Sequence, residues 1–106
     1  MTGRKLRITR AARSDLENIR RRTIDTWGRD QWLRYYGGLE GAFGRLRADP
    51  RTGRERAALA PGLRSLLFAS HVIFFYETRR GELVVLRVLH QKQNAEALKW
   101  ADQMEK

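Results

Sequence analysis

The stretch 71–90, HVIFFYETRRGELVVLRVLH, constrains the fold more than any other part of the chain. Two apolar arms flank Arg79-Arg80-Gly81, and glycine readily takes the positive φ that a tight turn requires. The pattern therefore predicts a β-hairpin. Side chains alternate along a strand, so one face of the first arm carries Val72, Phe74 and Tyr76 and the other carries Ile73 and Phe75.

The second arm is also apolar on both faces. Its alternation predicts Val84, Leu86 and Val88 on one face and Leu83, Val85 and Leu89 on the other. An antiparallel sheet with one solvated face is polar on that face. The hairpin is therefore predicted to lie in the middle of a sheet, with cover on each side.

The segment before the hairpin predicts one strand and two helices. Lys5 to Thr9 alternates as a short half-buried strand does, and Thr9 can cap the helix that follows. Gly28 is suited to end that first helix, and Asp49-Pro50 to end the second. The two apolar stripes comprise Ala12, Leu16, Ile19, Thr23 and Trp27, then Trp32, Tyr35, Tyr36, Leu39, Phe43 and Leu46. The aromatic residues Trp27, Trp32, Tyr35, Tyr36 and Phe43 are predicted to be core.

Four glycines interrupt the second helix, each at a cost of about 0.8–1 kcal/mol relative to alanine. Gly37, Gly41 and Gly44 share a stripe opposite the aromatic one, so the glycines, Gly38 included, are not expected to let the helix approach its own core. Two interpretations stay open. They are tolerated surface glycines in a soft helix, or a smooth strip against which a helix of another chain lies.

The rest of the chain completes an α+β domain over residues 1–106. Residues 50–62 are predicted to be a loop with at most one helical turn, and 63–69 a strand. Asn94 can cap a short final helix, packed either through Leu98, Ala101 and Met104 or through Trp100. The predicted order is β-α-α-β-β-β(-α), an antiparallel sheet packed against a helical hairpin. Two helices cover only one face, so the other face should expose an apolar patch on the order of several hundred Å² for a partner.

Composition excludes some classes of protein and suggests others. The chain has 22 Lys and Arg against 12 Asp and Glu, a net charge of +10 that attracts RNA, DNA or an acidic protein alike. Cysteine is absent, and neither a signal peptide nor a long apolar run is seen, so we expect a cytoplasmic protein without a membrane span. No metal-ligand cluster, phosphate loop or cofactor motif stands out.

Several motifs, in order and nearly end to end, resemble the ParE branch of the ParE/RelE toxin superfamily. They are A-x-x-D-L-x-x-I from Ala12 to Ile19, W-G at Trp27-Gly28, Y-x-x-x-L-x-x-x-F-x-x-L from Tyr35 to Leu46, D-P-x-x-G-R from Asp49 to Arg54, P-G-L-R-S from Pro61 to Ser65, H-V-I-F-F-Y from His71 to Tyr76, and V-L-R-V-L-H-Q from Val85 to Gln91.

This resemblance implies the toxin of a type II toxin–antitoxin system, of the kind known from plasmid stabilisation. Its partner would be a ParD-like antitoxin, a small DNA-binding dimer whose acidic, partly disordered C-terminal tail folds over the toxin. DNA would then be contacted only indirectly, through the antitoxin. ParE-type toxins are associated with poisoning of DNA gyrase, whereas RelE-type toxins are ribosome-dependent mRNA endoribonucleases.

Between these two activities, the sequence favours the non-enzymatic gyrase inhibitor. An RNase needs a base, an acid and cations for the phosphorane charge. RelE-like sites gather these near the last strand and the C-terminus, yet no Tyr, His or Arg follows His90. If the chain is an RNase, Arg64, Arg87 and His90 are the expected catalytic residues, with His71 and Lys92 as further candidates. A third hypothesis is an antitoxin-bound interaction module without toxicity.

Each basic candidate has a structural alternative. Arg87 either pairs internally with Glu77 or Glu82, faces solvent, or meets an antitoxin carboxylate or the target on an exposed sheet face. His90 is either a strand-end histidine bonded to backbone or a base, and His71 can bond to the adjacent turn. For Arg64, a plain surface position is as open as a binding role. The expected antitoxin- or target-binding set is Arg64, His71, Arg87, His90, Gly37, Gly41 and Gly44.

Overall fold

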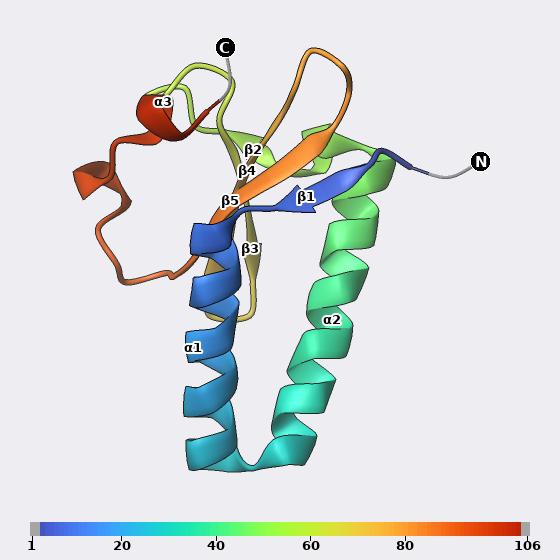
Figure 1. The fold of residues 1–106 in the computed structure, drawn as a ribbon, viewed down its shortest axis with the longest axis vertical. Helices are drawn as coiled ribbons and strands as arrows, with labels where there is room; N and C mark the ends of the chain where they lie inside the picture. The colour runs from blue at the N-terminus through green and yellow to red at the C-terminus, as the bar shows by residue number, and fades with distance from the viewer. Residues whose placement is uncertain (1–2, 105–106) are drawn as a thin grey trace.

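A computed structural model describes residues 3–104, so the ends of the predicted 1–106 domain lie outside the described residues. A five-stranded sheet has the order β1-β5-β4-β3-β2, and the antiparallel helices α1 and α2 extend from one face of it (Figure 1). The elements are β1 Leu6–Ile8, α1 Arg10–Trp27, α2 Arg29–Ala48, a 3₁₀ turn Pro50–Thr52, β2 Arg54–Glu55, β3 Arg64–Phe68, β4 His71–Glu77, β5 Leu83–His90, a 3₁₀ turn Ala95–Ala97 and α3 Trp100–Gln103.

The predicted hairpin is confirmed as β4 and β5, in mid-sheet between β3 and β1. Its turn closes where Gly81, at φ 86°, donates its N–H to the Thr78 carbonyl over 2.9 Å. The Thr78 hydroxyl accepts from the Glu82 N–H at 3.1 Å, which holds the second half of the turn.

The α+β architecture is confirmed, with one refinement of the sheet. Strands β2 to β5 are antiparallel, as predicted, but β1 pairs parallel with β5, Leu6 opposite Leu83 and Ile8 opposite Val85. A parallel pair needs a long crossover, and the helices and three strands between β1 and β5 supply it. The two-residue strand β2 lies inside the segment predicted to be a loop.

Both helix boundaries follow from their capping residues. The Thr9 hydroxyl accepts from the Ala12 N–H at 3.1 Å, and Gly28, at φ 91°, donates to the Ile24 carbonyl at 2.9 Å. Helix α2 ends at Ala48, before Asp49-Pro50. No helix within residues 3–104 combines the length and the apolar character needed to cross a membrane.

The inner core lies between the sheet and the two helices. It is built from Ala12, Ile19, Leu39, Ala42, Phe43, Leu46, Ile73, Phe75, Leu83, Val85 and Val88. The prediction of a core position is wrong for two of the aromatic residues, since Trp27 is 74% exposed and Tyr36 39% exposed. The helices run well beyond the edge of the sheet, so the tip of their hairpin has no sheet to pack against (Figure 1).

A β-bulge corrects the predicted alternation in β5. The register passes from Phe74 opposite Arg87 to Phe75 opposite Val85, so Leu86 has no partner of its own. Beyond the bulge the phase is reversed: Val88 joins the inner core and Leu89 the outer one. The bulge also leaves Arg87 on the side of α1.

The prediction that one face of the sheet is left bare is wrong. Phe74, Tyr76 and Leu86 on this outer face are 4% exposed or less. They are covered by the chain's own Leu63 and by Trp100, whose ring lies 4.5 Å from that of Phe74. The Trp100 indole N–H donates to the Ala95 carbonyl at 2.8 Å, which fixes the ring over the sheet. One large aromatic residue thus lets a four-residue helix cover a face that otherwise needs a longer one.

The glycines of α2 divide into two groups. A Cβ on Gly38 would lie 2.6 Å from the ring of Phe68, so this glycine does let the helix approach its own core, contrary to the prediction. A Cβ on Gly37 or Gly44 would meet nothing within 4 Å, and one on Gly41 only the end of Arg45 at 3.9 Å. The predicted exposed stripe is confirmed, and a partner against it stays a prediction.

Candidate functional site

Three of the predicted site residues meet at the end of the β4–β5 hairpin that lies away from its turn. His71 and His90 are opposite each other in the ladder, with ring centroids 5.5 Å apart in an edge-on arrangement. Arg87 lines the same cleft, which has a volume of about 180 Å³. We name it the histidine cleft; its lining is Asp15, Asn18, Ile19, Arg22, His71, Arg87, Val88, His90 and Gln93.

Of the alternatives open for Arg87, internal pairing is confirmed, but its partner is Asp15 of α1 and not Glu77 or Glu82. Its guanidinium donates to both carboxylate oxygens of Asp15, at 2.7 and 2.8 Å, and the side chains are 24% and 13% exposed. The Val88 N–H adds a third bond to Asp15, at 2.9 Å. Hydrogen bonding to Asp15 raises the pKa of Arg87, against the opposing effect of burial. The ion pair therefore fastens α1 to β5 and occupies the guanidinium.

His71 is bonded to α2, not to the adjacent turn. Its Nδ1 lies 3.0 Å from the Tyr35 hydroxyl. Burial lowers the pKa of His71, and the neighbouring His90 and Arg22 lower it further. Burial raises the pKa of Tyr35 to about 12. At neutral pH the neutral imidazole of His71 thus lies beside the protonated phenol of Tyr35.

His90 is bonded to backbone, which confirms the strand-end interpretation. Its Nδ1 accepts from the Lys92 N–H at 3.1 Å, and its own N–H donates to Oε1 of Gln93 at 2.8 Å. Because Nδ1 accepts, the neutral ring carries its proton on Nε2.

The other predicted site residues lie elsewhere. Arg64 is on β3, where it donates to the Gly53 carbonyl at 2.9 Å, and it does not line the histidine cleft. A Cβ on Gly53 would lie 2.5 Å from the Phe75 ring, which explains the glycine in the D-P-x-x-G-R motif. The expected RNase set of Arg64, Arg87 and His90 is therefore not gathered in one cleft.

Sequence reasoning did not find four polar residues of the cleft, Asp15, Asn18, Arg22 and Gln93, nor the bond of Tyr35 to His71. For Asp15 a signal existed, because residues four apart share a helix face and Asp15 precedes the buried Ile19 by four. An acid on a core-facing stripe needs a cation as its partner, and Arg87 stands on an otherwise apolar strand. Nothing local marks Gln93, which reaches the cleft only through the bend after β5.

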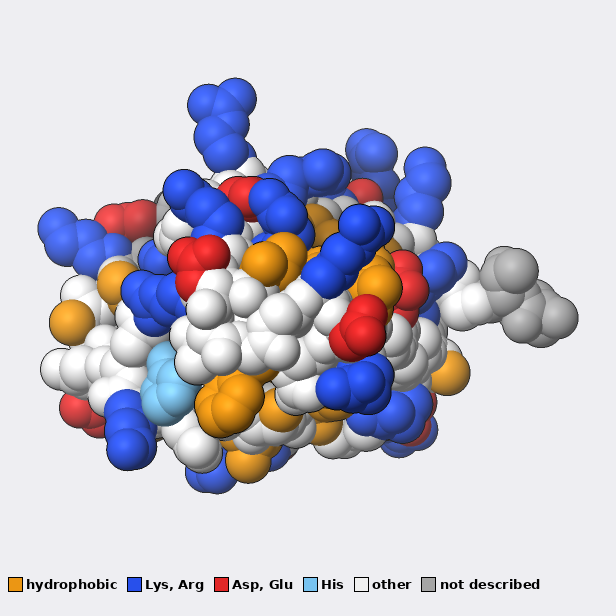
Figure 2. All heavy atoms as spheres, turned by 90° about the horizontal axis from the view of Figure 1, so that it is seen from below, with side chains coloured by type: hydrophobic (Ala, Val, Ile, Leu, Met, Phe, Trp, Pro, Cys, Tyr) orange, Lys and Arg blue, Asp and Glu red, His pale blue; other side chains and the backbone are white. Residues whose placement is uncertain are grey.

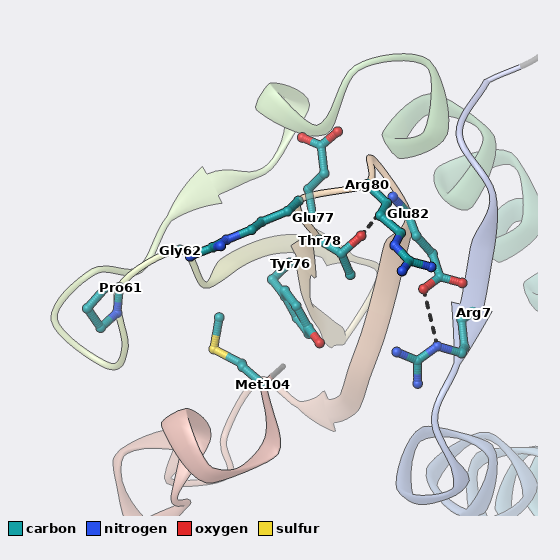
Figure 3. Close-up of a pocket in the computed structure, with 10 residues that line it drawn as sticks. Arg7, Pro61, Gly62, Tyr76, Glu77, Thr78, Arg80, Glu82 and Met104 are labelled. Atoms are coloured by element: carbon teal, nitrogen blue, oxygen red, sulfur yellow. Dashed lines mark hydrogen bonds and ion pairs between the residues drawn. The ribbon is translucent and has the colours of Figure 1, made fainter. Parts of the chain in front are cut away.

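A larger groove of about 650 Å³ lies at the turn end of the hairpin (Figure 3). Tyr76 and Met104 stand on one side of it, and Arg7, Arg80 and Glu82 on the other. Arg7 pairs with Glu82 at 3.4 Å. Within residues 3–104, neither this groove nor the histidine cleft groups three side chains suited to bind a metal ion.

Apolar side chains are exposed at the far end of the helices. Trp27, Leu33 and Tyr36, which we name the hairpin-tip patch, are 74%, 53% and 39% exposed. Figure 2, which looks onto this end, shows hydrophobic side chains among many Lys and Arg, with a histidine reaching the surface.

The sheet also has a partly open edge. Strand β2 pairs only with Arg64 and Ser65, so in the described chain the remaining β3 residues, Leu66 to Phe68, have no neighbouring strand on that side. Leu67, 59% exposed, lies on this open stretch. An unpaired strand edge is a ready template for pairing with another chain.

Two solved structures share this fold. One is described as the chromosomal ParDE toxin–antitoxin system from P. aeruginosa, with a TM-score of 0.70, 22% identity, and coverage of 82% of this chain and 95% of that one. The other is the RelBE2 toxin–antitoxin complex from Mycobacterium tuberculosis, with a TM-score of 0.63, 24% identity, and coverage of 88% and 97%. These likenesses show that the fold is RelE/ParE-like.

Sequence similarity narrows the class. Residues 6–95 match the family model described as the ParE toxin of the type II toxin–antitoxin system parDE. Toxin ParE1 of Mycobacterium tuberculosis is 40% identical over 89 residues, 84% of this chain and 91% of the relative. Toxin ParE1 of Caulobacter vibrioides is 33% identical over 91 residues, 86% and 93%. The chain belongs to the ParE toxin family of type II toxin–antitoxin systems.

Proposed function

We propose that this chain is neutralised by direct binding of a ParD-like antitoxin with an acidic C-terminal tail, and that its cellular target is DNA gyrase. The antitoxin part rests on one observation above the others: large apolar side chains of the hairpin-tip patch are exposed on a chain with a net charge of +10. An acidic, apolar polypeptide is the partner that such a surface attracts.

Two features support this mode of binding. An amphipathic segment of the antitoxin can lay its apolar side on Trp27 and Leu33, and an extended segment can add a strand at Leu66 to Phe68. A tail that folds on binding also gains from the field of the surrounding arginines. The structural relatives described as a ParDE system and a RelBE2 complex are consistent with such a partner.

Gyrase inhibition is preferred over RNA cleavage because the RNase candidates are committed to structural bonds. Arg87 is held by Asp15, Arg64 by the Gly53 carbonyl, and Nδ1 of His90 by the Lys92 N–H. A general base needs a free lone pair within reach of the ribose hydroxyl. The RelE-type activity is kept as the alternative because His71 and His90 do lie side by side in a cleft.

A supercoiling assay tests the target. Purified gyrase should lose supercoiling activity, or accumulate cleaved DNA, in the presence of this chain, and the antitoxin encoded beside it should restore activity. If gyrase is unaffected while ribosome-bound mRNA is cut, and His90→Ala abolishes cutting, the RelE-type alternative is correct. If expression without the antitoxin harms no cell, the chain is an interaction module and neither activity applies.

A further inference from the structure

We propose that the histidine cleft is an oxyanion site that receives one carboxylate side chain of the antitoxin's acidic tail. The inference rests on the antitoxin binding proposed above and adds to it a specific anchor. Nothing in the family match or the structural likeness assigns a role to this cleft, and none of its residues except Ile19 and Val88 is apolar.

The acceptor atoms of the cleft are already used by the protein itself. Oδ1 of Asn18 accepts from Arg21 at 2.7 Å, and Oε1 of Gln93 accepts from the His90 N–H at 2.8 Å. Nδ1 of His90 accepts from the Lys92 N–H at 3.1 Å. What these side chains have left are donors: two amide NH₂ groups, for which no acceptor is recorded within residues 3–104, and the Nε2–H of His90.

The one carboxylate of the cleft does not oppose an incoming anion. Both oxygens of Asp15 are bonded to Arg87, and one of them also to the Val88 N–H. The pair is neutral as a unit. A ligand with acceptors only, which means an oxyanion, is therefore the chemistry that fits.

The charged side chains of the cleft favour a ligand that carries a single negative charge. Arg22 lines it from α1, four residues after Asn18, and in the described chain it forms neither a hydrogen bond nor an ion pair. Arg87 is neutralised by Asp15, and burial lowers the pKa of His71, so Arg22 is the uncompensated arginine of the cleft. One carboxylate balances it, and charge-assisted hydrogen bonds are the strong ones.

The surroundings favour a peptide as the source of the carboxylate. A series of ring contacts leads from His90 to the hairpin-tip patch: His90 to His71 at 5.5 Å, His71 to Tyr35 at 5.6 Å, Tyr35 to Trp32 at 5.9 Å and Trp32 to Tyr36 at 5.4 Å. A polypeptide with apolar side chains on that patch can place an Asp or Glu in the cleft. A nucleic acid would bring its further phosphates against the same aromatic residues.

The first test uses purified antitoxin and two charge-matched variants. Arg22→Gln removes the uncompensated cation, whereas Arg79→Gln removes an exposed arginine at the opposite end of the hairpin. We expect Arg22→Gln to weaken antitoxin binding about tenfold or more and Arg79→Gln to change it less than about twofold. Neutralising one particular Glu or Asp of the tail should weaken binding to the wild-type chain but not to Arg22→Gln. Equal effects of the two variants, or no tail carboxylate coupled to Arg22, would overturn the proposal.

The second test needs no antitoxin. Acetate titrated into the chain should shift the His90 imidazole resonances in NMR spectra, and Arg22→Gln should remove the shift. No shift would overturn the oxyanion site, and a stronger response to inorganic phosphate or to an oligonucleotide would overturn the carboxylate assignment. If acetate shifts His90 but the antitoxin does not bind the chain, the proposed partner fails while the anion preference of the cleft stands. Urea unfolding of Arg22→Gln verifies that the variant is folded.

Discussion

Removal of Asp15 should destabilise the chain strongly, although the residue lies on a helix surface partly open to solvent. The Asp15→Ala variant leaves the Arg87 guanidinium and the Val88 N–H without their partner in a site where the two side chains are only 24% and 13% exposed. Breaking a buried ion pair from one side costs about 3–5 kcal/mol. Water can still reach Arg87, so the expected loss is at the lower end, about 3 kcal/mol.

Urea unfolding followed by far-UV circular dichroism measures this loss. With a slope of about 1.5 kcal/mol per M for a chain of this size, the midpoint should fall by about 2 M. Arg87→Met should cost a similar amount, because it leaves the Asp15 carboxylate with only the Val88 N–H. The double variant should be more stable than the sum predicts, with a coupling of about 1–3 kcal/mol.

The pair of Arg20 and Glu17 supplies a matched control. It is equally short, at 2.6 Å, and lies on the same helix, but both side chains are well exposed to solvent. Its double-mutant cycle should give no coupling above experimental error. If Asp15 and Arg87 couple no more than Arg20 and Glu17, the burial argument for the cleft is wrong.

Three further predictions concern stability. Trp100→Ala should lower the free energy of unfolding by about 3–5 kcal/mol, since it removes the ring that covers the outer face. The variant should also bind a hydrophobic dye. Unchanged urea unfolding would refute the claim that Trp100 covers this face. Gly38→Ala should destabilise because its Cβ would meet Phe68, whereas Gly44→Ala should stabilise by up to about 1 kcal/mol; the reverse order in thermal melts would contradict the assigned contact. Burial lowers the pKa of His71 in the folded state, so the unfolded chain takes up the proton first and stability falls as pH drops below about 6.5. His71→Gln should lessen this dependence between pH 5 and 8, and an unchanged profile would assign it to other groups.

The arrangement of elements was predictable because each one is marked locally. Thr9 and Gly28 set the first helix through side-chain and backbone hydrogen bonds that involve only nearby residues. The apolar arms around Gly81 determine the hairpin in the same way. Such local signals place elements in order, which is enough to indicate an α+β domain.

The departures from prediction depend on tertiary context. A β-bulge opposite Phe74 and Phe75 reverses which face Val88 and Leu89 occupy, and no residue type in β5 announces it. Trp100 helps to cover the outer face although it belongs to a helix of only four residues, because one large aromatic side chain buries about 150–250 Å². Trp27 has the helical spacing of a core residue, but it falls beyond the end of the sheet.

The candidate site was predictable only in part. Residue type and strand position were enough to single out His71, Arg87 and His90, and the structure brings these together. Arg22 could not be chosen from 22 Lys and Arg by sequence, because its distinction is that it lines the histidine cleft and has no ion pair there in the described structure. Which cation is left unpaired is a property of the folded surface.

Hydrogen–deuterium exchange with and without the antitoxin tests most directly where the partner binds. We predict slower exchange in residues 24–36 at the hairpin tip, in 66–68 on the open edge of β3 and in 90–93 beside the histidine cleft, with residues 98–104 unchanged. Faster exchange in 98–104 without slower exchange at the three predicted segments, together with a change in Trp100 fluorescence, would contradict it. That result would mean that the antitoxin displaces the C-terminal segment and occupies the sheet face that this segment covers.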